Sequence, residues 1–151
     1  MQKLLSSLLC AGLLLLAALA VSAQQIPNKK LSQSDLEAAQ AETKSAGGNQ
    51  ATLVYATRLD AVQKGAFDSL VVIYAKGNDY YAMVVRAGKR YMLKTAQKEQ
   101  AIQTGDRFQR LGIKYEEGKA PLLRLFATDN RGALRNVDYR YNGLDFVPEG
   151  Q

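Results

Sequence analysis

The sequence predicts an α+β protein in which N-terminal helices are followed by six or seven antiparallel strands. Two observations favour this class. Apolar residues recur with a helical period up to about residue 66, and from Phe67 onward the period falls to about two, which is typical of strands. Most segments between the expected strands hold only two to five residues, which is too short for a crossover and makes neighbouring strands antiparallel.

The first 23 residues have the three parts of a secretory signal peptide: a basic start at Lys3, an apolar run and a small-residue cleavage site. Cleavage is expected between Ala23 and Gln24. The apolar run Leu8–Val21 has 14 residues, fewer than the roughly 20 that span a bilayer. We therefore expect no stable membrane anchor after cleavage. Cys10, the only cysteine, would be removed with the run, and a cysteine-free exported chain is typical of a bacterial periplasm or exterior.

Residues 24–33 are polar and predict a flexible lead-in to a single α+β domain over 34–151. The stretch "SDLE", Ser34 to Glu37, has the pattern of a capping box and predicts a helix that ends at Gly47 and Gly48.

A second helix is expected over Ala51–Lys64. Its apolar residues recur at steps of four, three and four, which would place them on one helical face, and Gly65 would end the helix. The residues of this expected face are Tyr55, Leu59, Val62 and Ala66.

The expected strands begin with Ser69–Ala75, which is apolar on both faces and should be the most central. A short helix could occupy Thr95–Gln103, a bulge is expected near Gln109, and the sheet could close into a small barrel that removes its edges. The other strands are Tyr80–Arg86, Arg90–Lys94, Arg107–Tyr115, Pro121–Thr128, Arg135–Tyr141 and, after the hairpin signal Asn142-Gly143, Leu144–Val147.

The composition excludes several kinds of chemistry. The chain has no histidine, and the mature part has no cysteine, so imidazole, thiolate and zinc-finger sites are not available. Glu116 and Glu117, the only adjacent acidic pair, fall in an expected hairpin turn, and Asp129 with Asn130 also reads as a turn rather than a calcium loop. We therefore expect no enzymatic activity, no catalytic residues, no metal and no cofactor.

The positive signal is basic residues that alternate with apolar ones on the strands. The net charge is +6, and the excess lies after Ser69. This arrangement predicts either a cationic binding surface or an ordinary solvated sheet face. Seven basic residues are expected on the solvent-exposed face of one sheet: Arg86, Arg90, Lys94, Arg110, Lys114, Arg124 and Arg140.

The sequence therefore predicts an exported, non-enzymatic binding or interaction module. Its expected partner is an anionic cell-envelope polymer or the acidic surface of another envelope protein, and not a nucleic acid. Two alternatives remain: a β-barrel that binds a small ligand, and a hydrolase that uses carboxylates alone.

Overall fold

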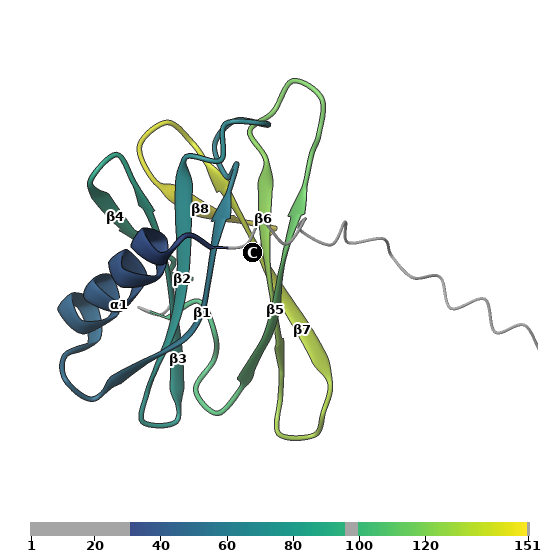
Figure 1. The fold of residues 1–151 in the computed structure, drawn as a ribbon. Coiled ribbons are helices and arrows are strands. Elements are labelled where there is room, and N and C mark those ends of the chain that lie inside the picture. Colours follow the sequence, from purple (N-terminus) through teal and green to yellow (C-terminus); the bar gives the residue numbers. More distant parts are fainter. Residues whose placement is uncertain (1–30, 96–99, 151) are drawn as a thin grey trace, which may run out of the picture.

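A computed structural model describes residues 31–95 and 100–150 of the chain. The described part contains one helix and eight strands (Figure 1). The predicted α+β class is confirmed, but the predicted number of six or seven strands is too low. The elements are α1 (Gln33–Gly47), β1 (Ala51–Leu59), β2 (Ser69–Lys76), β3 (Asp79–Arg86), β4 (Lys89–Met92), β5 (Arg107–Lys114), β6 (Leu122–Thr128), β7 (Leu134–Tyr141) and β8 (Phe146–Glu149).

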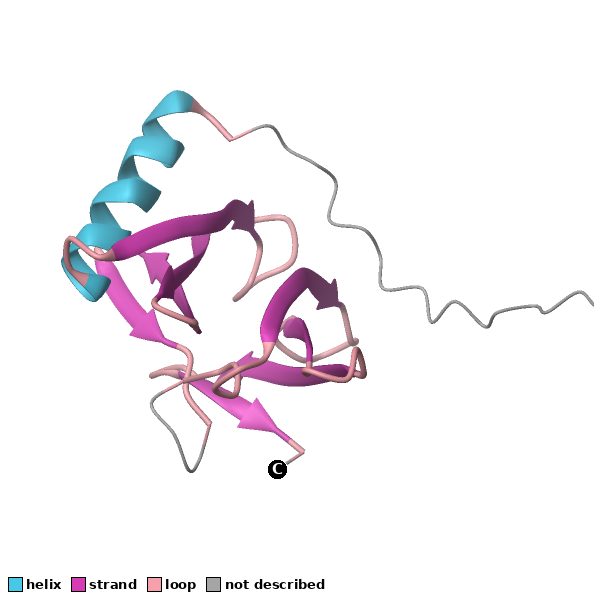
Figure 2. Ribbon diagram, turned by 90° about the horizontal axis from the view of Figure 1, so that it is seen from below, coloured by secondary structure: helices cyan, strands magenta, loops and turns pink. Residues whose placement is uncertain are grey.

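The strands form two four-stranded antiparallel sheets instead of one. Sheet A has the order β1-β2-β3-β4 and sheet B the order β5-β6-β7-β8, so each sheet is a meander of consecutive strands. The sheets face each other and α1 covers the far side of sheet A, which gives three layers (Figures 1 and 2). The expected closed barrel is wrong, because no strand of one sheet pairs with a strand of the other within the described residues.

The predicted second helix is also wrong, because most of its residues form β1. Thr52, Val54 and Tyr55 are β-branched or aromatic residues that favour strands, and β1 pairs with β2 along its length. A bulge between Leu53 and Tyr55 shifts the register. The helical spacing has another origin: a step of four from Tyr55 to Leu59 keeps one face of a strand as well as of a helix, and Val62 and Ala66 lie in the loop after β1. Gly65 does have a positive φ, of 85°, but it lies in the loop that follows β1.

The first helix ends at Gly47 as predicted, but it begins earlier than the capping-box pattern indicated. The N-cap is Ser32, whose hydroxyl accepts a hydrogen bond from the Asp35 amide at 3.1 Å, while Ser34 lies inside the helix. The alanine-rich helix buries Ala39, Thr43 and Gly47 against sheet A. This thin face is sufficient because the sheet supplies the larger apolar side chains.

Alternation correctly predicted the inward-facing residues of most strands, but Arg86, expected on the solvent side, lies on the inner side of β3 with Ala82 and Val84 and over the Tyr141 ring. β2 is buried along most of its length, as expected for the most central strand, and the bulge near Gln109 is present as a register shift between Phe108 and Arg110. The expected helix Thr95–Gln103 lies partly outside the described residues, and its described ends are not helical.

The main core lies between the two sheets. Sheet A contributes Val71, Ile73 and Val84, and sheet B contributes Leu123, Leu125 and the fully buried Tyr139 among others. Aromatic pairs close both sides of this core: Tyr55 packs against Phe108 and Tyr91 against Phe146, each with ring centroids 5.6 Å apart.

A second, smaller core lies between sheet A and α1. It is built from Leu70, Val72, Tyr74 and Met83 under Ala39 of the helix. Sheet A is therefore covered on both faces, whereas no helix of the described residues covers the outer face of sheet B (Figures 1 and 2). In the described part of the chain, no helix has the length and apolar character needed to span a membrane.

Replacing Gly47 with alanine should destabilise the protein. A Cβ atom at this position would overlap the Cβ of Ala51 and come within 2.8 Å of the Tyr74 ring. We expect a loss of about 1–3 kcal/mol, typical of overpacking, although alanine is intrinsically the better helix former. Urea denaturation measures this loss. Ser45→Ala, on the exposed side of the same helix, should change the free energy of unfolding by less than about 0.5 kcal/mol; equal effects of the two variants would contradict the prediction.

Candidate functional site: the outer face of sheet B

The outer face of sheet B carries a set of basic side chains that alternate with the core residues of the same strands. Five basic residues point outward, together with the carboxylates of Asp138 and Glu149. We call this set the basic face. It consists of Arg107, Arg110 and Lys114 on β5, Arg124 on β6 and Arg140 on β7.

Four of the seven cations predicted from sequence thus lie together on this face: Arg110, Lys114, Arg124 and Arg140. The other three belong to sheet A and do not join them, because alternation cannot tell which strands share a sheet. Arg90 points toward α1 and bonds Glu42 at 2.7 Å. Arg86 ends β3 and bonds Asp68 at 2.6 Å, and Lys94 follows β4.

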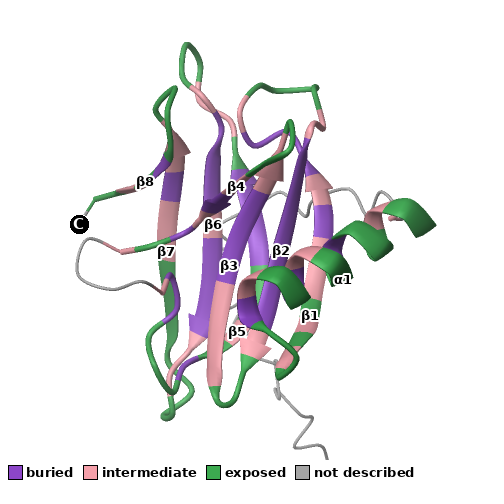
Figure 3. Cartoon of the chain, turned by 90° about the vertical axis from the view of Figure 1, so that its left-hand side faces the viewer, coloured by how far each residue is buried: buried purple, intermediate pink, exposed green. Residues whose placement is uncertain are grey.

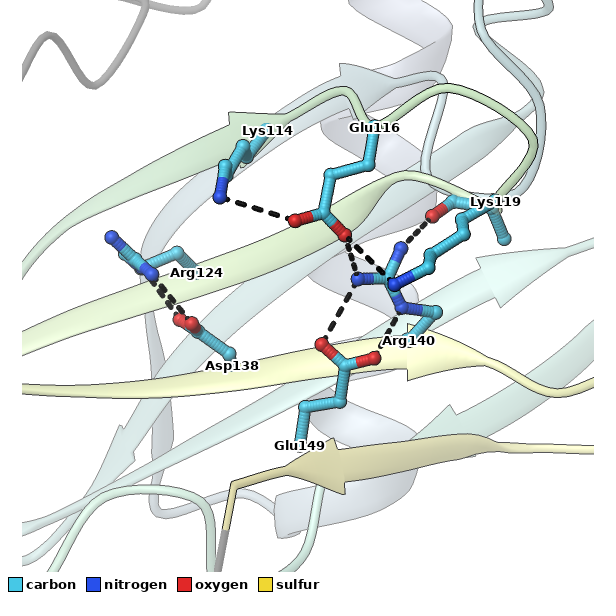
Figure 4. A network of polar contacts seen from close by, with 8 residues as sticks. Lys114, Glu116, Lys119, Arg124, Asp138, Arg140 and Glu149 are labelled. Carbon is cyan, nitrogen blue, oxygen red and sulfur yellow. Dashed lines mark hydrogen bonds and ion pairs between the residues drawn. The ribbon is translucent and has the colours of Figure 1, made fainter.

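The centre of the basic face is a forked ion pair between neighbouring strands. Arg124 donates two hydrogen bonds of 2.6 Å to the two carboxylate oxygens of Asp138, directly opposite in the register (Figure 4). The carboxylate raises the pKa of the Arg124 guanidinium above its usual value. Two parallel hydrogen bonds fix the guanidinium plane and therefore hold Arg124 in one orientation.

Arg140 is the centre of a second network at the end of the face. Its guanidinium bonds the carboxylates of Glu149 and Glu116 and the carbonyl of Ala120 (Figure 4). Lys114 also donates to Glu116, at 3.1 Å. Lys114, followed by Arg140, lowers the pKa of Glu116, and Arg140 lowers the pKa of Glu149.

The cations also cover apolar residues on the same face. The Arg110 guanidinium lies 4.1 Å from the centre of the Phe126 ring, and Arg124 lies 6.0 Å from it. Leu122 sits between Lys114 and Arg140 in the register and is only 3% exposed. Phe126 and Leu122 are thus buried under long basic side chains, which cover apolar surface with their stems while the charged ends stay in water.

Arg110 differs from the other cations of the face. Within residues 31–95 and 100–150 no carboxylate pairs with it, and its side chain is exposed beside the exposed Arg107. Lys114, Arg124 and Arg140 are instead paired with acids of the same protein. Positive charge is therefore least compensated by acidic residues at the start of β5, where Arg107 and Arg110 lie.

The remaining acidic candidates have structural roles. Glu116 lies in the turn after β5, where Lys119 donates its amide to the Glu116 carbonyl, as expected for a hairpin tip. The Asp129 carboxylate accepts the amides of Arg131 and Ala133, which confirms the predicted turn. Among the described residues, no group of three or more histidine, cysteine or acidic side chains is placed to hold a metal ion.

A buried polar pair was missed at the sequence level. Asp60 is 2% exposed and accepts a 2.6 Å hydrogen bond from the Tyr115 hydroxyl, which links the loop after β1 to the loop after β5. Burial, with the nearby Asp60 carboxylate as a second cause, raises the pKa of Tyr115. Asp60 also accepts the Gly65 amide. No local pattern could indicate this pair, because its members are 55 residues apart.

Comparison with known proteins assigns neither a family nor a function to this chain. No protein-family model, no curated protein and no solved structure matches the chain. The function must therefore be argued from the geometry of the molecule itself.

Replacing Arg140 with glutamine should raise the pKa of Glu149 and Glu116 toward the ordinary value of 4.5. Glu149 should rise more, because Arg140 is the main cause of its lowered pKa, while Glu116 keeps Lys114. Lowered carboxylate pKa values give stability that is present above pH 4.5 and is lost as the pH falls through the folded-state values. The variant should therefore lose less stability on acidification than the wild type.

Carbon-detected NMR titration of the glutamate carboxyl groups measures these pKa values. Asp35 of α1, measured in the same way, has a pKa lowered by Arg58 and lies away from the basic face, so it serves as an internal control whose pKa should be the same in both proteins. An unchanged pKa of Glu149 in the variant would contradict the network.

Proposed function

We propose that the protein is an exported, non-enzymatic binding module that docks the acidic surface of another envelope protein on the basic face of sheet B. One observation supports this proposal most directly. At the start of β5, Arg110 stacks on Phe126 and has no carboxylate partner among the described residues. Arginine and aromatic residues are enriched at protein interfaces, and an arginine already held on a ring loses less entropy when it binds.

A protein partner fits this face better than an anionic polymer does. Asp138, Glu149 and Glu116 lie among the cations, so a uniformly negative chain would meet three carboxylates as well as the basic side chains. A folded partner can place acidic groups at Arg107 and Arg110 and neutral or basic groups near the carboxylates. Such patterned charge gives specificity and a faster association rate.

The other functions weighed from sequence have weaker support. The small-ligand alternative has weaker support because it depends on a closed barrel, and the two sheets do not pair with each other within the described residues. For a hydrolase, one carboxyl group must act as a general acid with a raised pKa, whereas the pKa values of Glu116 and Glu149 are lowered by cations.

A fluorescein-labelled peptide with two acidic residues flanked by neutral ones can serve as a probe for a patterned acidic surface, with binding followed by fluorescence anisotropy at two salt concentrations. Binding to the mature wild-type chain should weaken at least fivefold between about 50 mM and about 200 mM salt, because exposed charges are screened. The double variant Arg107→Gln, Arg110→Gln should bind at least fivefold more weakly than the wild type at low salt.

The matched control is Lys76→Gln, Arg131→Gln, which removes the same net charge from exposed positions off the basic face. Equal losses in the two double variants would mean that only net charge matters and would reject the face. Capture of partners from an envelope extract with wild type and Arg107→Gln, Arg110→Gln then separates the partner classes. Recovery of polymer rather than protein would overturn the choice of a protein partner.

A further inference from the structure

A groove of about 650 Å³ lies between α1 and the start of β1. Figure 3 shows how α1 lies across sheet A. The groove is bounded by Glu37, Ala41 and Lys44 on the helix and by residues 51–53 at the start of β1. Its size is within the range of pockets that hold small ligands or short chain segments. The groove is separate from the basic face, because sheet A and sheet B are different layers.

The strand side of this groove is a free sheet edge. β1 is the first strand of sheet A, and no described strand pairs with its outer side. An edge strand presents unpaired amide and carbonyl groups that can accept another extended chain. The bulge between Leu53 and Tyr55 interrupts the regular strand, so the segment that can be extended is short, Ala51–Leu53.

A buried hydroxyl in the groove has no partner. Thr43 lines the groove and is 3% exposed, and its Oγ1 makes no hydrogen bond to any described residue. A buried polar atom without a hydrogen bond costs free energy, and such atoms are few in native proteins. Because Thr43 lines the groove, a small rotation of its side chain would let a bound chain supply the missing hydrogen-bond partner.

The two ends of the groove carry opposite charges. Glu37 and Lys44 are two helical turns apart, about 10 Å along the axis. Neither forms an ion pair with another residue in the described ranges, and Glu37 accepts only the neutral Gln33 amide. On an extended chain, residues on one face are about 7 Å or about 13 Å apart, which flexible side chains can match to this separation.

The direction of a bound chain follows from the arrangement of α1 and β1. Asp35 near the start of α1 bonds Arg58 near the end of β1, and Gly47 lies against Ala51. The helix and the strand therefore run in opposite directions. A chain antiparallel to β1 runs in the direction of α1 and reaches Glu37 before Lys44.

We propose that this groove binds a short extended peptide of a partner protein, which adds as a strand to Ala51–Leu53. Its basic side chain pairs with Glu37 and an acidic side chain further along pairs with Lys44. The Thr43 hydroxyl bonds the peptide. A second copy of the whole chain is the less suitable occupant, because the bulge prevents a long continuous strand pairing.

Two synthetic peptides test this proposal on the mature chain labelled with ¹⁵N. The probe is acetyl-TKTVTET-amide, and the control is acetyl-TETVTKT-amide, which has the same composition with the charges exchanged. The probe should shift the amide signals of residues 51–53 and of α1, and should bind at least fivefold more tightly than the control. Absence of shifts at 51–53, or equal affinity of the two peptides, would overturn the proposal.

A charge exchange in the protein gives a stricter test. In Glu37→Lys, Lys44→Glu the preference should invert, so that acetyl-TETVTKT-amide binds more tightly. The net charge of the protein is unchanged by this double substitution, so an unchanged preference would overturn the assigned end charges. Arg107→Gln, Arg110→Gln should keep wild-type affinity for the probe, which separates this site from the proposed function of the basic face.

Thr43→Val tests the hydroxyl. It removes an unpartnered polar atom from a buried position, so it should keep or raise the melting temperature while weakening probe binding at least threefold. A lower melting temperature with unchanged affinity would assign the hydroxyl to the fold. Sedimentation of the free chain at increasing concentration shows whether it dimerises; a dimer that the probe dissociates would make a second copy the occupant and overturn the peptide assignment.

Discussion

The fold depends on the burial of sheet A on both faces. In β2, Val71 and Ile73 point toward sheet B, while Leu70 and Val72 point toward α1. A strand that is apolar on both faces is stable only between two covering layers. Helix α1 and sheet B are those layers. Sheet B needs no cover of its own, because its outer apolar residues are screened by arginine and lysine stems.

The polar contacts divide into two kinds with different roles. Arg58–Asp35, Arg90–Glu42 and Tyr115–Asp60 each connect two layers and set how they sit on one another. Arg124–Asp138 instead lies within sheet B and faces solvent. It orders the surface without joining layers. This difference is the physical reason why we propose recognition at the outer face of sheet B and not at the paired cations of sheet A.

The sequence allowed the inward and outward positions of most strands to be predicted, because side chains alternate along any extended chain. Val137, Tyr139 and Tyr141 lie on the inner side as expected, opposite Asp138 and Arg140. Alternation says nothing about which strands share a sheet, so Arg90 was grouped with Arg124 although the two lie in different layers. The spacing in Ala51–Lys64 favours a helix because the four-residue step from Tyr55 to Leu59 fits a helix and a strand equally well, and the loop residues Val62 and Ala66 continue it by chance. Long-range pairs such as Asp60 and Tyr115 leave no local pattern at all.

The separation of the two sheets has a mechanical consequence. All strand pairings described here lie within β1–β4 or within β5–β8, so the layers adhere through side chains alone. Side-chain contacts permit small sliding movements that a continuous hydrogen-bonded ladder would resist. Any movement of one sheet against the other would therefore disturb the Tyr115–Asp60 bond and the packing around Tyr139, while each sheet could keep its internal register.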